Sequence, residues 1–376
     1  MTSHQYEGVR QGLEGIVAAA TRLSRVDGEA GQLTIAGYTV EDLAPRATFE
    51  EVVYLLLHGR LPGREELVHF AAELAGRRQL PRATVELLRE ATIAGAGGMD
   101  ALRMGTATLG IGVGESPVEQ ALVAIAAFPA IIGAWWRLRN GRCPAPVLPD
   151  LSHAAHFLQQ LTGVEPDPEK SRALETYLNT VCDHGLNAST FTARVIVSTR
   201  SDVISAITGA VGAMKGPLHG GAPGPALNMV FEVGTAGRAE AIIAERLDRG
   251  ERLMGFGHRV YRVRDPRADV LAAAAERLYA AGADRQVYDL ARHVEATALR
   301  LLRQRKPDRR IETNVEFYTA LLLHGIGLPV ELFTPAFAAG RVAGWSGHCL
   351  EQLREGRLIR PESEYIGPVG LSLSPR

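Results

Sequence analysis

Hydrophobic positions recur along most of this 376-residue chain at the three- and four-residue spacing of amphipathic helices. The stretch TFEEVVYLLLHGRLP shows this pattern with both of its boundaries. Thr48 and Glu51 have capping-box spacing at its start, and Gly59 and Pro62 end the apolar run. REELVHFAAEL and TVELLREATIAG follow with the same period, and strand patterns do not alternate with them. The pattern therefore predicts an all-α fold of many helices.

Proline marks the expected start of several further helices. Proline lacks a backbone N–H and suits the first helical position, where that group would have no partner in the helix. We expect helices to open at the pairs Ser116-Pro117, Asp167-Pro168, Asp265-Pro266 and Thr334-Pro335.

The period changes near the N-terminus. LSRVDGEAGQLTIAGYTV contains two short extended runs around Asp27-Gly28 and Gly31. Glycine and aspartate between short apolar runs are typical of a hairpin turn. The sequence therefore predicts a small N-terminal β-hairpin beside the helices.

The longest uncharged run extends from Ala121 to Trp136 and contains Pro129. It is short for a helix that crosses a bilayer, which needs about 20 apolar residues. We therefore expect a buried helix in a large core and no association with a membrane.

Two helix-breaking segments suggest how the chain is divided. Glycine and proline are concentrated at residues 212–225 and again at 325–329. A chain of this length favours two domains. We expect a large helical domain of residues 1–218 and 325–376, and a small helical domain of residues 219–324.

Composition and charge narrow the class of protein. Hydrophobic residues make up 46% of the chain and charged residues 22%, and the formal net charge is −1. No overall field attracts nucleic acid, so we expect no such partner. Cys143, Cys182 and Cys349 lack the spacing of a disulfide framework. The N-terminal residues lack a basic segment followed by an apolar one. A cytoplasmic protein is the simplest interpretation.

Side chains that can carry chemistry gather on irregular backbone between the predicted helices. GAMKGPLHGGAPGP holds His219, and MGFGHRVYRVRDPR holds His258 and a cluster of arginines. Glycine allows a ligand to approach the backbone closely, and histidine exchanges protons near neutral pH. Arginine binds carboxylates through two parallel hydrogen bonds. These residues suit proton transfer on a substrate that carries carboxylates. Further polar residues on such segments are Asp183, His184, Asn187, Ser189, Glu316 and Arg341.

Plainer interpretations apply to several of these features. The arginine cluster at 259–267 is also typical of a solvated basic surface. The spacings between His184, His219 and His258 match no short zinc motif and no cysteine accompanies them, so we expect no metal. Lone histidines within helical patterns are interpreted as structural or solvated groups: His58, His69, His153, His156, His293, His324 and His348.

Taken in order, several segments resemble the citrate synthase family, in its shorter bacterial and archaeal type. They are GLEGIVAAATRLSRVDGEAGQLTIAGYTVEDLA, DLSHAAHFLQQLTG, DHGLNASTFTARV, KGPLHGGAPGPALNM, GFGHRVYRVRDPRA, NVEFYTALLL and FTPAFAAGRVAGWSGHCLEQL. The resemblance covers nearly the whole chain. It implies a multi-helical, two-domain homodimer whose small domain closes over the substrates. It also implies condensation of acetyl-CoA, a co-substrate, with oxaloacetate and hydrolysis of the citryl thioester, without a permanently bound cofactor.

The resemblance also implies roles for individual residues. His219 is similar to the histidine that stabilises the enol of the thioester, and His258 to the one that polarises the oxaloacetate carbonyl. His184 and Asn187 match an oxaloacetate contact and an active-site asparagine. The carboxylate-binding arginines would be Arg267, Arg341 and Arg360, the last from the partner subunit, and Arg262 would meet a CoA phosphate.

One position departs from the family pattern. The enolising base is usually the aspartate of N-V-D-F, and this chain has Asn314-Val-Glu-Phe317. Glu316 keeps the carboxylate but adds a methylene, which shifts it by ~1 Å unless the backbone compensates; a shift of that order can cost about 10²-fold in rate. A fully active enzyme with a displaced backbone, a 2-methylcitrate synthase that uses propionyl-CoA, and a weakly active or non-catalytic paralogue all remain open.

Overall fold

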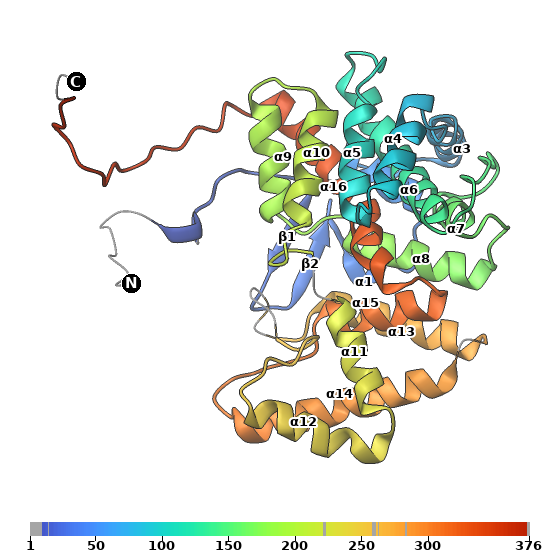
Figure 1. Cartoon of the computed structure of the whole chain (residues 1–376), viewed down its shortest axis with the longest axis vertical. Helices are drawn as coiled ribbons and strands as arrows, with labels where there is room; N and C mark the ends of the chain where they lie inside the picture. The colour runs from blue at the N-terminus through green and yellow to red at the C-terminus, as the bar shows by residue number, and fades with distance from the viewer. Residues whose placement is uncertain are drawn as a thin grey trace.

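The computed structural model describes residues 10–13, 15–220, 223–257, 261, 263–282 and 284–373. Within these ranges the chain forms 16 α-helices and one small three-stranded sheet (Figure 1), so the predicted all-α fold with a small N-terminal β element is confirmed. The helices are α1 (Val40–Leu43), α2 (Phe49–His58), α3 (Arg64–Ala75), α4 (Arg82–Ile93), α5 (Gly98–Thr108), α6 (Pro117–Arg139), α7 (His153–Thr162), α8 (Pro168–Val181), α9 (Ala188–Ser198), α10 (Val203–Met214), α11 (Pro223–Val233), α12 (Ala239–Asp248), α13 (Pro266–Ala280), α14 (Arg285–Arg305), α15 (Val315–Ile326) and α16 (Phe333–Glu355).

The small sheet contains the predicted hairpin and one additional short strand. The strands β1 (Ser24–Asp27), β2 (Gln32–Ile35) and β3 (Tyr38–Thr39) pair in that order, and both pairings are antiparallel. Gly31 has a φ of 66° in the turn before β2, a conformation that glycine adopts without strain. Leu33 and Ile35 face the core and are fully buried, so the sheet is fastened to the helices on one side.

Most of the predicted helix starts are confirmed by their caps. Thr48 and Glu51 form the capping box of α2, and Ser116, Asp167 and Asp265 cap helices that have proline in the first turn. The predicted start at Thr334-Pro335 is wrong. Helix α16 already begins at Phe333, directly after the short 3₁₀ helix η3 (Val330–Leu332). Thr334 does not cap it, because its hydroxyl donates instead to the carbonyl of Gly220 at 2.8 Å.

The main core is built around α6 and α16. Both are buried along most of their length, and Phe128, Trp135 and Trp345 fill the space around them. Helix α6 is long and apolar enough to cross a membrane, but 78% of its most apolar stretch is buried by the rest of the protein. That burial is typical of the core helix expected from the sequence. The bent pair of α15 with η3 and α16 passes the same test of length and composition.

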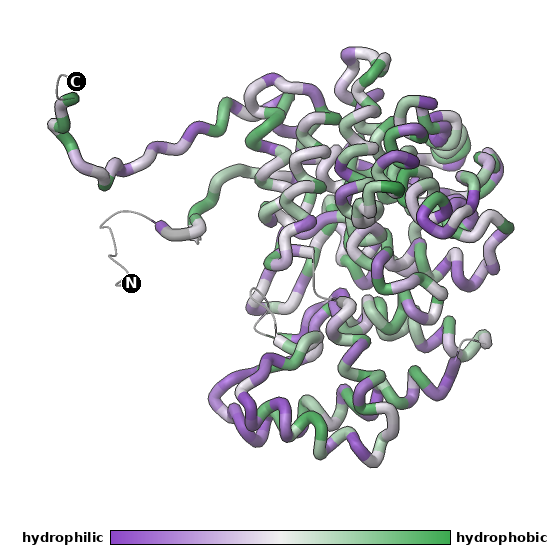
Figure 2. The backbone as a smooth tube through the Cα atoms, viewed as in Figure 1, coloured by the Kyte–Doolittle hydropathy of each residue, from purple (hydrophilic) through white to green (hydrophobic). Residues whose placement is uncertain are grey.

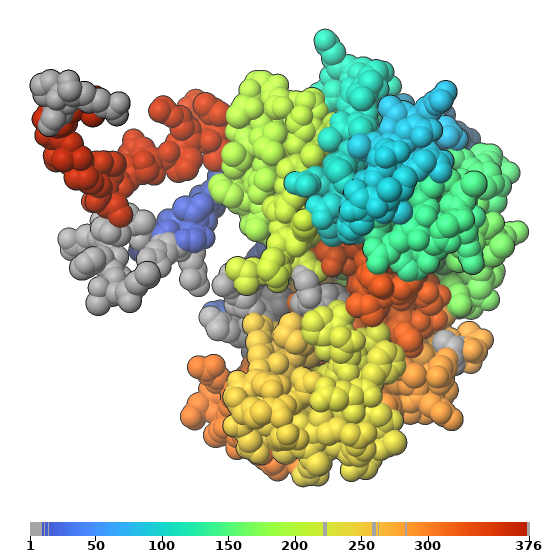
Figure 3. Space-filling model, viewed as in Figure 1, coloured from blue at the N-terminus to red at the C-terminus, as the bar shows by residue number. Residues whose placement is uncertain are grey.

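Helices α11, α12 and α14 lie together in the lower part of Figure 1, where α12 packs on α14 and α11 packs on α14 and α15. Helix α13 packs on α15 and α8 and so joins these helices to the main core. Figure 3 shows the yellow and orange side chains of this lower part gathered in one mass. The division into domains at residues 219 and 324 stays a prediction.

Candidate active site

A cavity of about 630 Å³ collects six of the residues singled out in the sequence. They come from segments far apart in the chain: His184, Asn187, His219, Arg267, Glu316 and Arg341. Arg360 is exposed in the segment after α16 and is not among the lining residues. His258 and Arg262 lie outside the described residues.

The loop between α8 and α9 supplies His184 and Asn187. Asn187 is the N-cap of α9, and its side-chain oxygen accepts a hydrogen bond from the backbone N–H of Thr190 at 3.1 Å. The side-chain oxygen is therefore committed to the helix start, which fixes the position of the amide group in the cavity wall. His184 contacts the hydroxyl of Tyr261 at 3.2 Å through Nε2.

Asp183, which precedes this pair, is fully buried and connects the loop to α16. Its Oδ2 lies 3.2 Å from Nε2 of His348 and accepts a hydrogen bond from Ser24 at 2.5 Å. The other ring nitrogen of His348 lies 2.9 Å from the guanidinium of Arg194. Since a guanidinium only donates, Nδ1 of His348 accepts and its Nε2–H donates to Asp183. Arg194 also pairs with Glu351 at 2.7 Å. We call Asp183, His348, Arg194 and Glu351 the buried ion network.

His219 lies in the turn that follows α10. Its Nε2 is 2.7 Å from the hydroxyl of Ser189, which also accepts from the indole N–H of Trp345 at 3.0 Å. Burial, aided by the charge of Arg341, lowers the pKa of His219 to about 4, so the ring is neutral at physiological pH. The hydroxyl of Ser189 has one proton, and Oδ1 of Asn187 lies 2.8 Å away as a second acceptor for it. When Ser189 donates to Nε2 of His219 instead, the ring proton is on Nδ1, and His219 can act as a neutral hydrogen-bond donor.

Two buried guanidinium groups line the cavity. Arg341 donates from Nε to the carbonyl of Val181 at 2.6 Å and lies over the ring of Phe337. Burial lowers its pKa to about 10, against the opposing charge of Asp183, so it stays protonated. Burial lowers the pKa of Arg267 too, but the charge of Asp265, its paired hydrogen bonds at 3.0 and 2.8 Å, and the nearby Tyr261 and Glu316 together outweigh burial and raise that pKa. Two fixed positive charges in one cavity suit a substrate with two carboxylates.

Glu316 lies in the first turn of α15. Asn314 caps this helix and accepts from the backbone N–H of Glu316 at 3.0 Å, while its amide group donates to the carbonyl of Gly257 at 2.8 Å. Burial raises the pKa of Glu316 despite the opposing charges of Arg252 and Arg267. A half-buried carboxylate with a raised pKa is a stronger base than an exposed one.

Two short segments pair just before the residues of interest: residues 312–314, which precede Glu316, and residues 255–257, which precede His258 in the sequence. Phe256 and Thr313 form an isolated antiparallel β-bridge, and the N–H of Gly257 donates to the carbonyl of Glu312 at 2.8 Å. Gly255 has a φ of 88°, and a side chain there would begin 3.0 Å from Phe317. Glycine is therefore required for this approach of the two segments.

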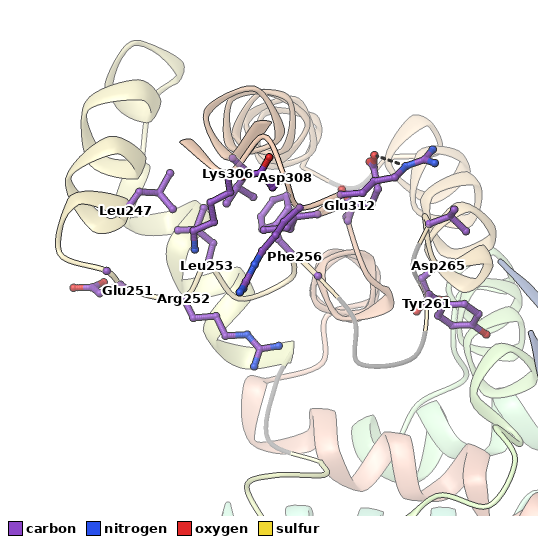
Figure 4. Close-up of a pocket in the computed structure, with 18 residues that line it drawn as sticks. Leu247, Glu251, Arg252, Leu253, Phe256, Tyr261, Asp265, Lys306, Asp308 and Glu312 are labelled. Atoms are coloured by element: carbon purple, nitrogen blue, oxygen red, sulfur yellow. Dashed lines mark ion pairs between the residues drawn. The ribbon is translucent and has the colours of Figure 1, made fainter. Parts of the chain in front are cut away.

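A second cavity, of about 970 Å³, opens beside the same two segments (Figure 4). Tyr261 and Val263, the neighbours of Arg262, are among its lining residues. Among the described residues, four cationic side chains also line it: Arg252, Lys306, Arg309 and Arg310. Figure 2 shows this turn after α14 as a hydrophilic stretch of backbone. These four residues were not among those predicted from the sequence, although the run RQRKPDRR, which contains Lys306, Arg309 and Arg310, was a visible signal for three of them. In the described part of the chain no group of His, Cys, Asp and Glu side chains is arranged to hold a metal ion.

Comparison with known proteins gives one consistent result. Residues 12–362 match the family described as "Citrate synthase, C-terminal domain". Citrate synthase of Haloferax volcanii is 39% identical, with 98% of each chain covered. A 2-methylcitrate synthase of Shewanella oneidensis is also 39% identical, covering 97% of this chain and 95% of that protein. The structure of Thermoplasma acidophilum citrate synthase in a ternary complex with carboxymethyl coenzyme A and oxaloacetate superposes with a TM-score of 0.86, at 31% identity and 98% coverage of both chains.

Proposed function

Since this chain belongs to the citrate synthase family, and is an enzyme of that transferase type, we propose that it condenses acetyl-CoA with oxaloacetate. The methyl carbon of the thioester bonds to the keto carbon of oxaloacetate, and water then cleaves the citryl thioester to give citrate and CoA. One observation carries this proposal: a carboxylate, a neutral imidazole and two guanidinium groups line a single cavity.

The chemistry of the first step assigns the proposed roles. Glu316 removes a proton from the methyl group of the thioester. This methyl group is a far weaker acid than any carboxylic acid. The negative charge that develops on the thioester oxygen must therefore meet a fixed donor as the proton leaves. His219 supplies that donor, and its low pKa keeps the imidazole neutral throughout.

Oxaloacetate is proposed to bind at the other polar groups of the cavity. Arg267 and Arg341 hold its carboxylates, and His184 with Asn187 hold its remaining oxygens. His258 is proposed, from the family resemblance, to polarise the keto group. Arg267 and Glu316 come from the proposed small domain, whereas His184 and Arg341 come from the proposed large one. This supports closure of the small domain over both substrates, which excludes water from the reacting thioester.

The acyl-CoA is proposed to place its phosphates in the cationic cavity. Arg252, Lys306 and Arg309 supply positive charge there. Tyr261 and Val263, the sequence neighbours of the arginine predicted to meet a CoA phosphate, also line this cavity. Lysine and arginine are the usual partners of phosphate oxygens.

A homodimer is proposed in which Arg360 completes the active site of the partner. Arg360 belongs to the segment that leaves the helical body after α16 (Figure 1), and it does not line the cavity of its own chain. Large hydrophobic side chains of this segment are exposed, among them Tyr365, Ile366 and Leu371. Packing on a second copy would bury them. The three cysteines are free, which supports a cytoplasmic location.

Mixed dimers test the proposed position of Arg360. Arg360→Ala and His219→Ala are each expected to be nearly inactive alone. Refolded together in equal amounts, they should recover about a quarter of the wild-type sites, because one site of each mixed dimer receives both intact residues. An Arg360 that acts within its own chain would give no recovery.

Thiol release from acetyl-CoA, with and without oxaloacetate, tests the function itself. We expect release that depends on oxaloacetate, and a loss of about 10²–10³-fold in kcat for His219→Ala, as for other removed oxyanion donors. His69→Ala, an exposed histidine on α3, is the matched control and should be fully active. Release without oxaloacetate, or none, would contradict the proposal. Higher kcat/KM with propionyl-CoA would identify a 2-methylcitrate synthase instead, which the set of relatives does not favour.

A further inference from the structure

Glu295 on α14 is a buried carboxylate that lines neither of the two cavities described above. Its Oε1 accepts from the hydroxyl of Thr313 at 2.7 Å and lies 3.3 Å from Arg264. Its Oε2 accepts from the hydroxyl of Tyr318 at 2.5 Å and from Arg292 at 3.0 Å. Arg292 also donates to the hydroxyl of Tyr318. Each of the two carboxylate oxygens of Glu295 therefore has two hydrogen-bonding partners.

The partners of Glu295 sit beside residues that are proposed to act on substrate. Thr313 is followed by Asn314, which caps α15 and accepts from the backbone of Glu316. Arg264 is followed by Asp265, which caps α13 and holds Arg267 in a two-point ion pair. A single carboxylate thus connects the starts of two helices, one carrying the proposed base and the other a proposed substrate arginine.

Such a connection can serve stability alone, because a buried carboxylate needs partners to offset its desolvation. Hydrophobic contacts would fasten α13 and α15 as well, however, since the two helices already pack on each other. Contacts of that kind do not set the position of a helix start to a fraction of an ångström. The hydrogen bond to Thr313 does, because it is directional and short, at 2.7 Å. The longer contact with Arg264, at 3.3 Å, connects Glu295 to the residue just before the cap of α13.

We propose that Glu295 is a positioning residue that fixes Glu316 relative to Arg267. This inference rests on the proposed function. It also addresses the longer side chain at position 316. The place of that carboxylate depends on where the first turn of α15 begins, and Glu295 holds this turn through Thr313 on one side and Tyr318 on the other.

Paired substitutions at position 313 test the proposal. Thr313→Ser keeps the hydroxyl that donates to Glu295, whereas Thr313→Val removes it at nearly constant volume. We expect Thr313→Val to lower kcat by about 10²-fold, the cost of a ~1 Å displacement of a catalytic group. Thr313→Ser should stay within a few-fold of wild type. The KM for oxaloacetate should change little in both, because the contact from Arg264 to Glu295 is retained.

Glu295→Gln gives the second measurement, because Thr313 lines the cationic cavity and Glu295 does not. We expect Glu295→Gln to lower kcat as much as Thr313→Val does. It should also raise the KM for oxaloacetate, since the contacts with both Thr313 and Arg264 are weakened. Adding Thr313→Val to Glu295→Gln should then cause little further loss in kcat, as expected for residues that act through one another. Asp289→Asn, which removes an exposed ion pair on the same helix, is the matched control.

The outcomes separate this inference from the proposed function. If wild type condenses the two substrates and Thr313→Val keeps its kcat, the inference is wrong and the function stands. A Thr313→Ser variant as slow as Thr313→Val also contradicts it, as does a loss that is fully explained by a lower folded fraction in thermal unfolding. If wild type shows no release that depends on oxaloacetate, the function fails and the inference fails with it.

Discussion

The two sides of the cavity are held by different physical means. On the α16 side, His184 follows Asp183 of the buried ion network, in which Asp183 and His348 are completely shielded from solvent. Arg341 bonds to the carbonyl of Val181, just before Asp183, and His219 contacts Ser189. On the α15 side, Arg267 and Glu316 are held by helix caps, by the bridge between Phe256 and Thr313, and by Glu295. The first side depends on charges inside the main core. The second combines helix caps and short paired segments with the buried ion pair of Asp265 and Arg267.

This difference separates stability from catalytic geometry. A buried charge that loses its partner carries a cost in every folded molecule, whether or not substrate is present. A displaced helix cap costs little in folding but moves the group that must reach the substrate. Substitutions that break the buried ion network should therefore lower the free energy of unfolding, and substitutions at the helix start of α15 should mainly lower the rate.

The largest effect on stability is expected from Arg194→Ala. Arg194 pairs with Glu351 and donates to His348, and all three side chains are buried. Removing it should lower the free energy of unfolding by about 3–5 kcal/mol, as for other broken buried pairs. The matched control is Arg249→Ala, whose pairs with Glu245 and Glu251 are exposed and, screened by solvent, contribute little to stability. Denaturant unfolding measures both. Equal losses for the two variants would remove the contrast between the sides.

A smaller effect, confined to the rate, is expected from Glu316→Asp. The backbone of α15 is fixed by its cap, so the shorter side chain falls short by ~1 Å, and kcat/KM should drop by about 10²-fold with unfolding nearly unchanged. An unchanged kcat/KM would mean that the extra methylene of Glu316 has no geometric consequence. A higher kcat/KM in the variant would indicate instead that the natural glutamate places its carboxylate less well than aspartate does.

Local signals in the sequence predicted much of the fold and identified many of the residues that line the candidate site. Capping residues and prolines gave the starts of α2, α6, α8 and α13, because these signals act within one turn. The start of α16 was missed because it depends on η3 and on a tertiary bond from Thr334 to Gly220. The roles of the polar residues came from resemblance, and their meeting in one cavity depends on packing that no local pattern encodes.

The buried groups between the site residues were the least predictable. Glu295 lies within an amphipathic pattern in α14, where a glutamate is normally solvated. His348 was interpreted as a structural histidine, and its place in the buried ion network agrees with that, but the sequence did not indicate Asp183 as its partner. Such pairings join residues 165 positions apart and follow only from the packed fold.

The smallest effect, and the one that compares the two sides most directly, is their response to pH. His219 has a folded pKa of about 4, below its ordinary value of 6.5, so the unfolded chain binds a proton first. Its contribution to stability is therefore lost as the pH falls from 6.5 to about 4.

Glu316 behaves in the opposite way. Burial raises its folded pKa above 4.5, so its contribution to stability falls as the pH rises through that raised pKa. Both groups are partly exposed, which keeps each effect small.

Measuring the free energy of unfolding from pH 4 to 7 for wild type, His219→Ala and Glu316→Gln checks this contrast. Relative to wild type, His219→Ala should gain stability as the pH falls, because it no longer loses the contribution of a neutral imidazole. Glu316→Gln should gain as the pH rises, because it carries no buried charge. Activity should rise with pH over the same range in which Glu316 costs stability, since the ionised carboxylate is the base. If the free energy of unfolding changed with pH in the same direction in both variants, the protonation of these groups would not be set by the environments described. The distinction between the two sides would then depend on Arg194→Ala and Glu316→Asp alone.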